Sequence, residues 1–150
     1  GILGAAPISP YRMPVENRRW RWLAAVAAGP VSNLLLAIVF SLIIRVIGVQ
    51  TLFGFPDLIQ QLLIQMVYWN VLLFVFNLIP LFPVDGWQIV YALLPPDLAS
   101  TWQRHAQTTQ LVFFGLILLS FLRLPGIPNI LGLLIGQPTQ QILQILLGNL

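Results

Sequence analysis

The decapeptide NLIPLFPVDG, Asn77–Gly86, interrupts a long apolar run near the middle of the chain. Pro80 and Pro83 favour extended backbone where a membrane helix would otherwise continue. The pair Asp85-Gly86 follows, and it is also a common signal for a tight turn. An acidic side chain at membrane depth is costly unless it pairs or binds a cation, so Asp85 is a candidate functional residue. The alternative is that Asp85 only forms the turn.

The composition indicates the class of protein. Of the 150 residues 58% are hydrophobic and only 7% are charged, with a mean hydropathy of +0.88. These values predict an all-α integral membrane protein. The seven basic residues do not form a long basic face, so we expect no nucleic-acid partner. Cysteine is absent, which excludes disulfides and thiolate zinc ligands.

Two membrane spans are expected before the break. Residues 1–22 contain clustered arginines and two tryptophans, which is typical of a cytoplasmic or interfacial segment. Residues 23–45 and 58–79 are each apolar over about 20 residues, the length that crosses a hydrocarbon core. The second span should end at Ile79, because the residue before a proline disfavours helix.

After the break we expect an extended loop over 80–86, a short helix over 87–94, a helix over 97–124 that contains a third span, and an amphipathic helix over 138–150. The whole chain is then one membrane domain with about three transmembrane helices and short interfacial helices. Asp97 is expected to cap its helix. His105, the only histidine, lies in a polar stretch and is expected to be solvated rather than a metal ligand.

Polar and small residues mark one face of each of the first two spans. Ala25, Gly29 and Asn33 recur every four residues, and the simplest interpretation is a packing seam between helices. Pro30 should kink this helix. Asn70 and Asn77 lie two turns apart in the second span. Hydrogen bonding between helices is the favoured interpretation of Asn70, whereas for Asn77 a structural and a functional role are equally supported.

The combination of Gly29–Asn33, GPVSN, with Asn77–Gly86 further along resembles the site-2 protease family of intramembrane zinc metalloproteases. The upstream segment Ala6–Arg12 is similar to the segment before the Gly-Pro helix in compact bacterial members without a PDZ domain. The resemblance covers nearly the whole chain and is strongest over 23–94. It implies a protein of the bacterial plasma membrane whose partners are lipid and a transmembrane substrate helix.

The resemblance also implies a zinc site. Zn²⁺ would be held by two histidines of a His-Glu-x-x-His motif and, as third ligand, by the aspartate that aligns with Asp85. The glutamate of that motif would act as general base, and the metal would lower the pKa of the attacking water. Asn77 and Asn33, by similarity, would shape the site or receive the unwound substrate helix.

The chain departs from the family pattern because it has no His-Glu-x-x-His motif. In the family this motif lies N-terminal to the Gly-Pro helix, so we expect the chain to be a C-terminal part that is inactive alone and packs with missing N-terminal helices. Trp87 and Gln88 replace the family's small and basic residues after Asp-Gly. The alternative is a non-catalytic membrane protein of the same fold that binds a partner helix.

Overall fold

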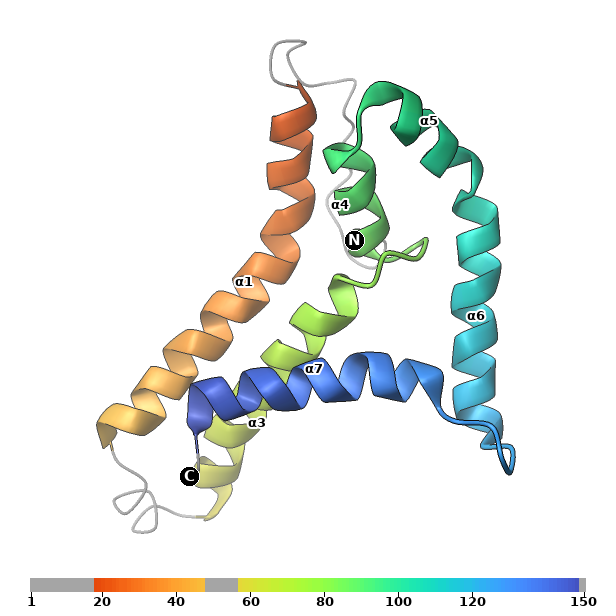
Figure 1. Cartoon of the computed structure of the whole chain (residues 1–150). Coiled ribbons are helices and arrows are strands. Elements are labelled where there is room, and N and C mark those ends of the chain that lie inside the picture. Colours follow the sequence, from red (N-terminus) through yellow and green to blue (C-terminus); the bar gives the residue numbers. More distant parts are fainter. Residues whose placement is uncertain (1–17, 48–56, 149–150) are drawn as a thin grey trace.

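The computed structural model describes residues 18–47 and 57–148, and within these ranges it contains helices and their connections with no strand. Figure 1 shows their arrangement: α3 lies beside the second half of α1, α4 lies beside the first half of α1, and α7 runs from the base of α6 back across α3. The helices are α1 (Arg18–Ile47), α3 (Asp57–Asn77), α4 (Asp85–Leu93), α5 (Pro96–Arg104), α6 (Ala106–Leu122) and α7 (Ile130–Leu147).

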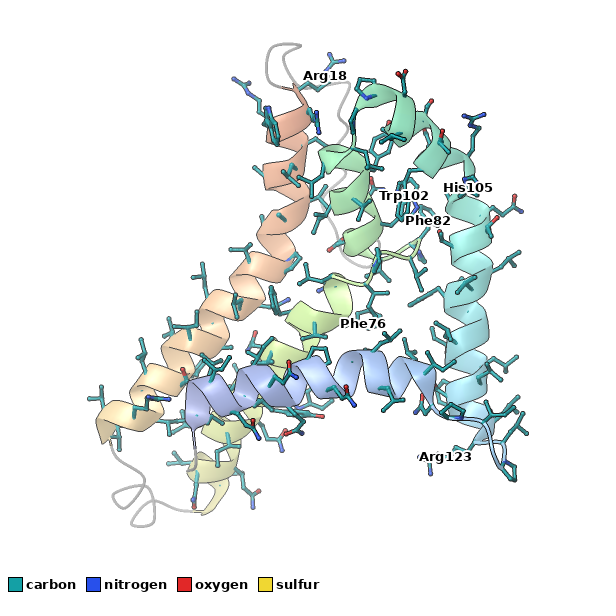
Figure 2. All side chains as sticks on the ribbon, in the orientation of Figure 1. Arg18, Phe76, Phe82, Trp102, His105 and Arg123 are labelled. Atoms are coloured by element: carbon teal, nitrogen blue, oxygen red, sulfur yellow. The ribbon has the colours of Figure 1, made fainter. Side chains whose placement is uncertain are left out.

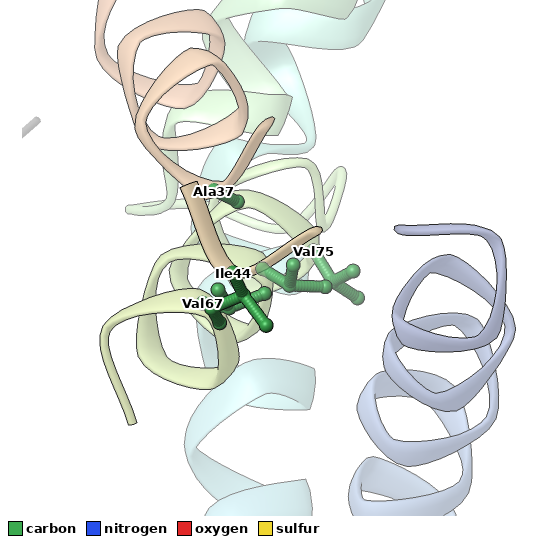
Figure 3. Packing of buried hydrophobic residues seen from close by; sticks show 5 residues of the cluster. Ala37, Ile44, Val67 and Val75 are labelled. Carbon is green, nitrogen blue, oxygen red and sulfur yellow. The ribbon is translucent and has the colours of Figure 1, made fainter. Parts of the chain in front are cut away.

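The main core is the contact between α1 and α3. Ala37 and Ile44 from α1, seven residues apart, meet a row of valines on α3 at four-residue spacing, Val67, Val71 and Val75. Figure 3 shows these side chains packed together where the two helices meet. Small and β-branched residues allow the two backbones to approach closely, which is the usual way in which helices pack in a membrane. This contact fixes the two helices that lead to the break.

Three described helices are long and apolar enough to cross a membrane: α1, α3 from Leu58, and α7. A fourth candidate is the pair α5 and α6, which are bent by 51° at their junction. The prediction of an all-helical membrane protein with about three spans is therefore confirmed. One of these three spans was not expected, because the C-terminal helix α7 was predicted to be amphipathic and not to cross the membrane.

The helix boundaries correct several expectations. The first helix begins at Arg18 rather than at residue 23, and Pro30 lies inside it. The region 97–124 is two helices that meet at His105 instead of one helix. The expected segment 1–22 can be compared only from Arg18 onward, and residues 1–17 of that segment lie outside the described residues.

The last helix is longer than expected, because α7 begins at Ile130 and not at residue 138. Asn129 caps its start: the side-chain Oδ1 accepts a hydrogen bond from the amide of Gly132 at 2.9 Å. Pro138 lies inside the helix, where it removes one backbone hydrogen bond. Packing outweighs this cost, since residues on both sides of Pro138, Ile135 and Ile142, contact the α1–α3 core.

Two arginines of α1 bind the C-terminal ends of other helices. Near the start of α1, the Arg19 guanidinium donates from Nε to the carbonyl of Ala92 at 2.5 Å and from Nη2 to that of Leu93, at the end of α4. Near its end, Arg45 donates from Nε to the carbonyl of Leu146 at 2.8 Å, in the last turn of α7. A cation at a helix C-terminus is favourable because the last carbonyls lack partners within the helix. The same helix therefore positions both α4 and α7.

Candidate functional site

The break lies between α3 and α4, from Leu78 to Val84. It contains turns rather than the uniformly extended backbone that was expected: Val84 N–H donates to the carbonyl of Leu81 at 2.8 Å, and the Phe82–Pro83 peptide bond is cis. The Asp85-Gly86 pair is not part of the loop, because α4 begins at Asp85. The candidate residue therefore lies in the first turn of a helix.

Asp85 is buried, with 7% of its surface exposed. It is the first residue of α4, where the unpaired backbone amides of the helix favour a negative charge. The carboxylate faces α1: a Cβ built on Gly29 would lie 3.5 Å from Asp85 Oδ2. Gly29 and Asp85, 56 positions apart in the sequence, are thus close neighbours.

Gly86, the second residue of α4, lies against the backbone that follows α3. A Cβ at this position would lie 2.3 Å from the carbonyl oxygen of Ile79 and 2.4 Å from that of Leu78. Only glycine fits at such a distance, because the obstructing atoms belong to the backbone. The Asp85-Gly86 pair is therefore held between α1 on one side and the end of α3 on the other.

The loop itself is attached to α6. The amide of Phe82 donates to Thr109 Oγ1 at 3.2 Å. Val84, together with Ile79, packs in a second apolar cluster with Phe113 of α6. These contacts come from residues far along the chain, and they hold the backbone that precedes Asp85.

The three asparagines have different surroundings. Asn70 is buried, and its side chain donates to the carbonyl of Met66 at 2.7 Å within the same helix, so the expected bond between helices is not the one observed. Asn33 is half-buried and lies one turn after Gly29, on the helix face that meets Asp85. Asn77 is half-buried and is the last residue of α3, directly before the Leu78–Ile79 backbone that Gly86 touches. A supporting role of Asn33 and Asn77 in a site at Asp85 stays a prediction.

Sequence reasoning missed the part that Trp87 has in the structure. This residue is 4% exposed, and its ring stacks on Tyr91 with centroids 5.7 Å apart. The ring of Trp102 lies 6.2 Å from it, and Trp102 Nε1 donates to the Trp87 carbonyl at 3.1 Å. Figure 2 shows Trp102 and Phe82 close to α4. The signal in the sequence was the set of aromatic residues Phe82, Trp87, Tyr91 and Trp102, and the contact of Trp87 with Trp102 joins α4 to α5.

The described residues do not form a complete metal site. Among residues 18–47 and 57–148 there is no group of three or more His, Cys, Asp or Glu side chains that could hold a metal ion. His105 is exposed, and its Nδ1 lies 2.8 Å from the carbonyl of Thr101. Zinc needs about four ligands, of which Asp85 could be one. The donor set of the described residues therefore does not fit a zinc ion by itself.

One comparison with known proteins gives a relative. The chain is 34% identical over 120 residues to the Bacillus subtilis (strain 168) protein named "Putative zinc metalloprotease YwhC", and the match covers 78% of this chain. It covers 52% of that protein, so the chain matches about half the length of its relative. No family model matches the chain, and no solved structure matches it.

The fold and the comparison together define a class. The chain is a helical membrane protein, in which three described helices are long and apolar enough to span the bilayer, and it is related to a protein named as a putative zinc metalloprotease. The name of that relative refers to zinc. Among the described residues of this chain, the buried candidate ligand is Asp85.

Proposed function

We propose that this chain is the C-terminal part of an intramembrane zinc metalloprotease of the site-2 protease type, with Asp85 as the third zinc ligand. The remaining ligands come from a His-Glu-x-x-His helix that this sequence does not contain. The observation that carries the proposal is the placement of Asp85: a buried carboxylate held between the Gly29 face of α1 and the end of α3. The 34% identity to a protein named as a putative zinc metalloprotease supports a metalloprotease-like role.

Burial of Asp85 is the main argument against a role as turn former only. A turn aspartate is usually exposed, because its charged form is stabilised by water. Asp85 is buried and belongs to a helix, whereas the turn precedes it. Asp97 provides the comparison within the chain: it also lies in the first turn of a helix, α5, but it is exposed.

The proposed substrate is a transmembrane helix of another protein, cleaved within the membrane. Asn33 lies one turn after Gly29 in α1 and Asn77 is the last residue of α3, and their amide groups can hydrogen-bond the backbone of an unwound peptide. These two residues are proposed as supporting residues. The protein would lie in the bacterial plasma membrane, with the arginine-rich N-terminal side in the cytoplasm.

The test compares two aspartate variants of the full-length protein reconstituted in vesicles. Asp85→Asn removes the charge of the proposed ligand while keeping its size, so bound zinc should fall by about 10-fold or more and cleavage of a membrane-embedded substrate should be lost. Asp97→Asn makes the same change at an exposed helix start and should leave both unchanged. Zinc is measured by atomic absorption, and cleavage by gel.

Two other outcomes of this experiment would contradict the proposal. If Asp85→Asn retains full zinc and full cleavage, Asp85 is not a ligand. If the unaltered full-length protein holds no zinc and cleaves no membrane-embedded substrate, the chain is instead a non-catalytic protein of this fold that binds a partner helix.

A further inference from the structure

One face of α6 lies against the loop that precedes Asp85. Phe113 is the buried residue of α6, and it packs in one apolar cluster with Val84 of the loop and with Ile79. Leu111 and Phe121, elsewhere on the same helix, are exposed. Figure 1 shows the loop extending from the end of α3 toward α6. The inward face of α6 is therefore directed at this loop.

Thr109 lies on that face, because it comes one turn before Phe113. Its hydroxyl makes two hydrogen bonds: Oγ1 donates to the carbonyl of Ala106 at 2.8 Å and accepts from the amide of Phe82 at 3.2 Å. A hydroxyl carries one hydrogen and two lone pairs, so both bonds can form at once. Thr109 is half-buried, and a methyl group in place of the hydroxyl would leave the Phe82 amide without this acceptor.

The Phe82 amide is connected to Asp85 by a short and tightly turned piece of backbone. Val84 N–H donates to the carbonyl of Leu81 at 2.8 Å, and α4 begins at the next residue, Asp85. On the other side of Asp85, Gly86 lies against the backbone that follows α3. A shift of the loop at Phe82 would therefore be passed on to the first residue of α4.

We propose that Thr109 is a positioning residue for the Asp85 carboxylate. The hydroxyl holds the Phe82 amide, the loop holds the start of α4, and the carboxylate keeps its place beside Gly29. Thr109 acts through the loop and touches no reacting atom. The proposal rests on the proposed function, because only a role of Asp85 in the reaction makes its exact position matter for turnover.

The experiment measures cleavage of a synthetic transmembrane peptide by the full-length protein in vesicles. Thr109→Val replaces the hydroxyl with a methyl group of similar size, and kcat should fall about 10-fold or more, since small misplacements of a reacting group can cost about 100-fold. KM should change little. Thr109→Ser keeps the hydroxyl and should have nearly the kcat of the unaltered protein. Thr108→Val is the matched control, because Thr108 is the exposed neighbour of Thr109, and it should change neither constant.

Hydrogen exchange followed by mass spectrometry gives a readout that does not depend on activity. The Phe82 amide should exchange about two- to tenfold faster in Thr109→Val, the factor expected for one lost hydrogen bond. Thr109→Ser and Thr108→Val should leave this exchange unchanged. Pro80 and Pro83 carry no amide hydrogen, so few other amides contribute to the signal of this segment.

Thr109→Ala is a second variant, which removes the same acceptor with a residue that favours helix more than valine does. It should show the same loss of kcat. If the unaltered protein cleaves the peptide and both variants turn over equally fast, the positioning role is wrong while the proposed function stands. A loss in Thr109→Ser as large as in Thr109→Val would also overturn the positioning role. If the unaltered protein cleaves no peptide, the proposed function is contradicted and the positioning role with it.

Discussion

Gly86, the second residue of α4, has the tightest surroundings among the glycines that the structure describes. The atoms that a Cβ would meet belong to the backbone of Leu78 and Ile79, which cannot move without moving the end of α3. Glycine here is required by close approach rather than by an unusual backbone angle. The same contact fixes the direction of the Asp85 side chain relative to α1.

The variant Gly86→Ala tests this contact. We expect it to lower the free energy of unfolding in detergent by about 1–3 kcal/mol, because overpacking against backbone cannot relax through a rotamer change. The matched control is Gly115→Ala in α6, where a Cβ meets nothing within 4 Å; this helix position should gain about 0.5–1 kcal/mol. Thermal unfolding followed by circular dichroism measures both. Equal stability of the two variants would contradict the contact.

The sequence identified Asp85 as a candidate functional residue because of its chemical type. A carboxylate in an apolar stretch is energetically unfavourable unless it pairs with another group or binds a cation. It was not informative about the neighbours of Asp85. Gly29 meets Asp85 across 56 positions, and Thr109 binds the amide of Phe82 from a third helix. Such contacts depend on how the helices pack, which local patterns of residue type do not specify.

At the scale of elements, Arg19 and Arg45 of α1 hold the C-terminal ends of α4 and α7. Arg45 donates two hydrogen bonds to the last turn of α7, to the carbonyls of Leu146 and Ile145. The interaction lies at the surface, so its contribution is reduced by solvent screening. Its effect should therefore be local to the end of α7.

Arg45→Gln should loosen the last turn of α7 while the rest of the protein stays folded. We expect a loss of about 0.5–1 kcal/mol from the missing charge at the helix C-terminus. Amide hydrogen exchange in the last turn should become about two- to fivefold faster, a factor that follows from that free energy. Arg45→Lys keeps the charge and should give an intermediate rate. Unchanged exchange in Arg45→Gln would show that α7 is held by its apolar contacts alone.

The end of α6 offers a stabilising substitution. Arg123 terminates this helix in the left-handed conformation, with φ of 44° and ψ of 51°. A residue with a side chain is strained there, whereas glycine is not, and glycine is the most common residue at such helix ends. Arg123→Gly should therefore raise the free energy of unfolding by about 0.5–1 kcal/mol. Arg123→Ala, measured by the same unfolding experiment, should give no gain.

The errors in predicting the C-terminal helices had a physical cause. The helices over 138–150 and 97–124 were expected from local patterns of apolar and polar residues. Tertiary packing against the α1–α3 core kept α7 helical through Pro138, and the chain bends at His105 between α5 and α6. The spans α1 and α3 were predicted well because their length and apolar content leave few alternatives.

At the scale of the whole molecule, α1 determines which ends of the helices share a side of the membrane. Its 30 residues extend about 45 Å, more than the ~30 Å hydrocarbon core. Arg19 ties the start of α1 to the end of α4, and Arg45 ties its end to α7. The α4–α5 region and the last turn of α7 should therefore face opposite sides.

The absence of cysteine allows a direct test of this topology. Single cysteines at Asp97 in α5 and at Val46 near the end of α1 are both exposed, the latter by 85%. A membrane-impermeant maleimide should label Asp97→Cys only from the cytoplasmic side and Val46→Cys only from the other side. Labelling of both from one side would contradict a membrane crossing by α1, and the reversed pattern would contradict the cytoplasmic placement.

The contacts of the Asp85-Gly86 pair have a consequence for assembly. Gly86 is seated against the α3 backbone, and Asp85 is buried beside Gly29, so the carboxylate is ordered by the folding of this chain alone. A group that is already immobile loses little conformational entropy when it binds. Any segment that completes a metal site here would meet a preorganised ligand, and affinity for the metal would depend mainly on how accurately that segment docks.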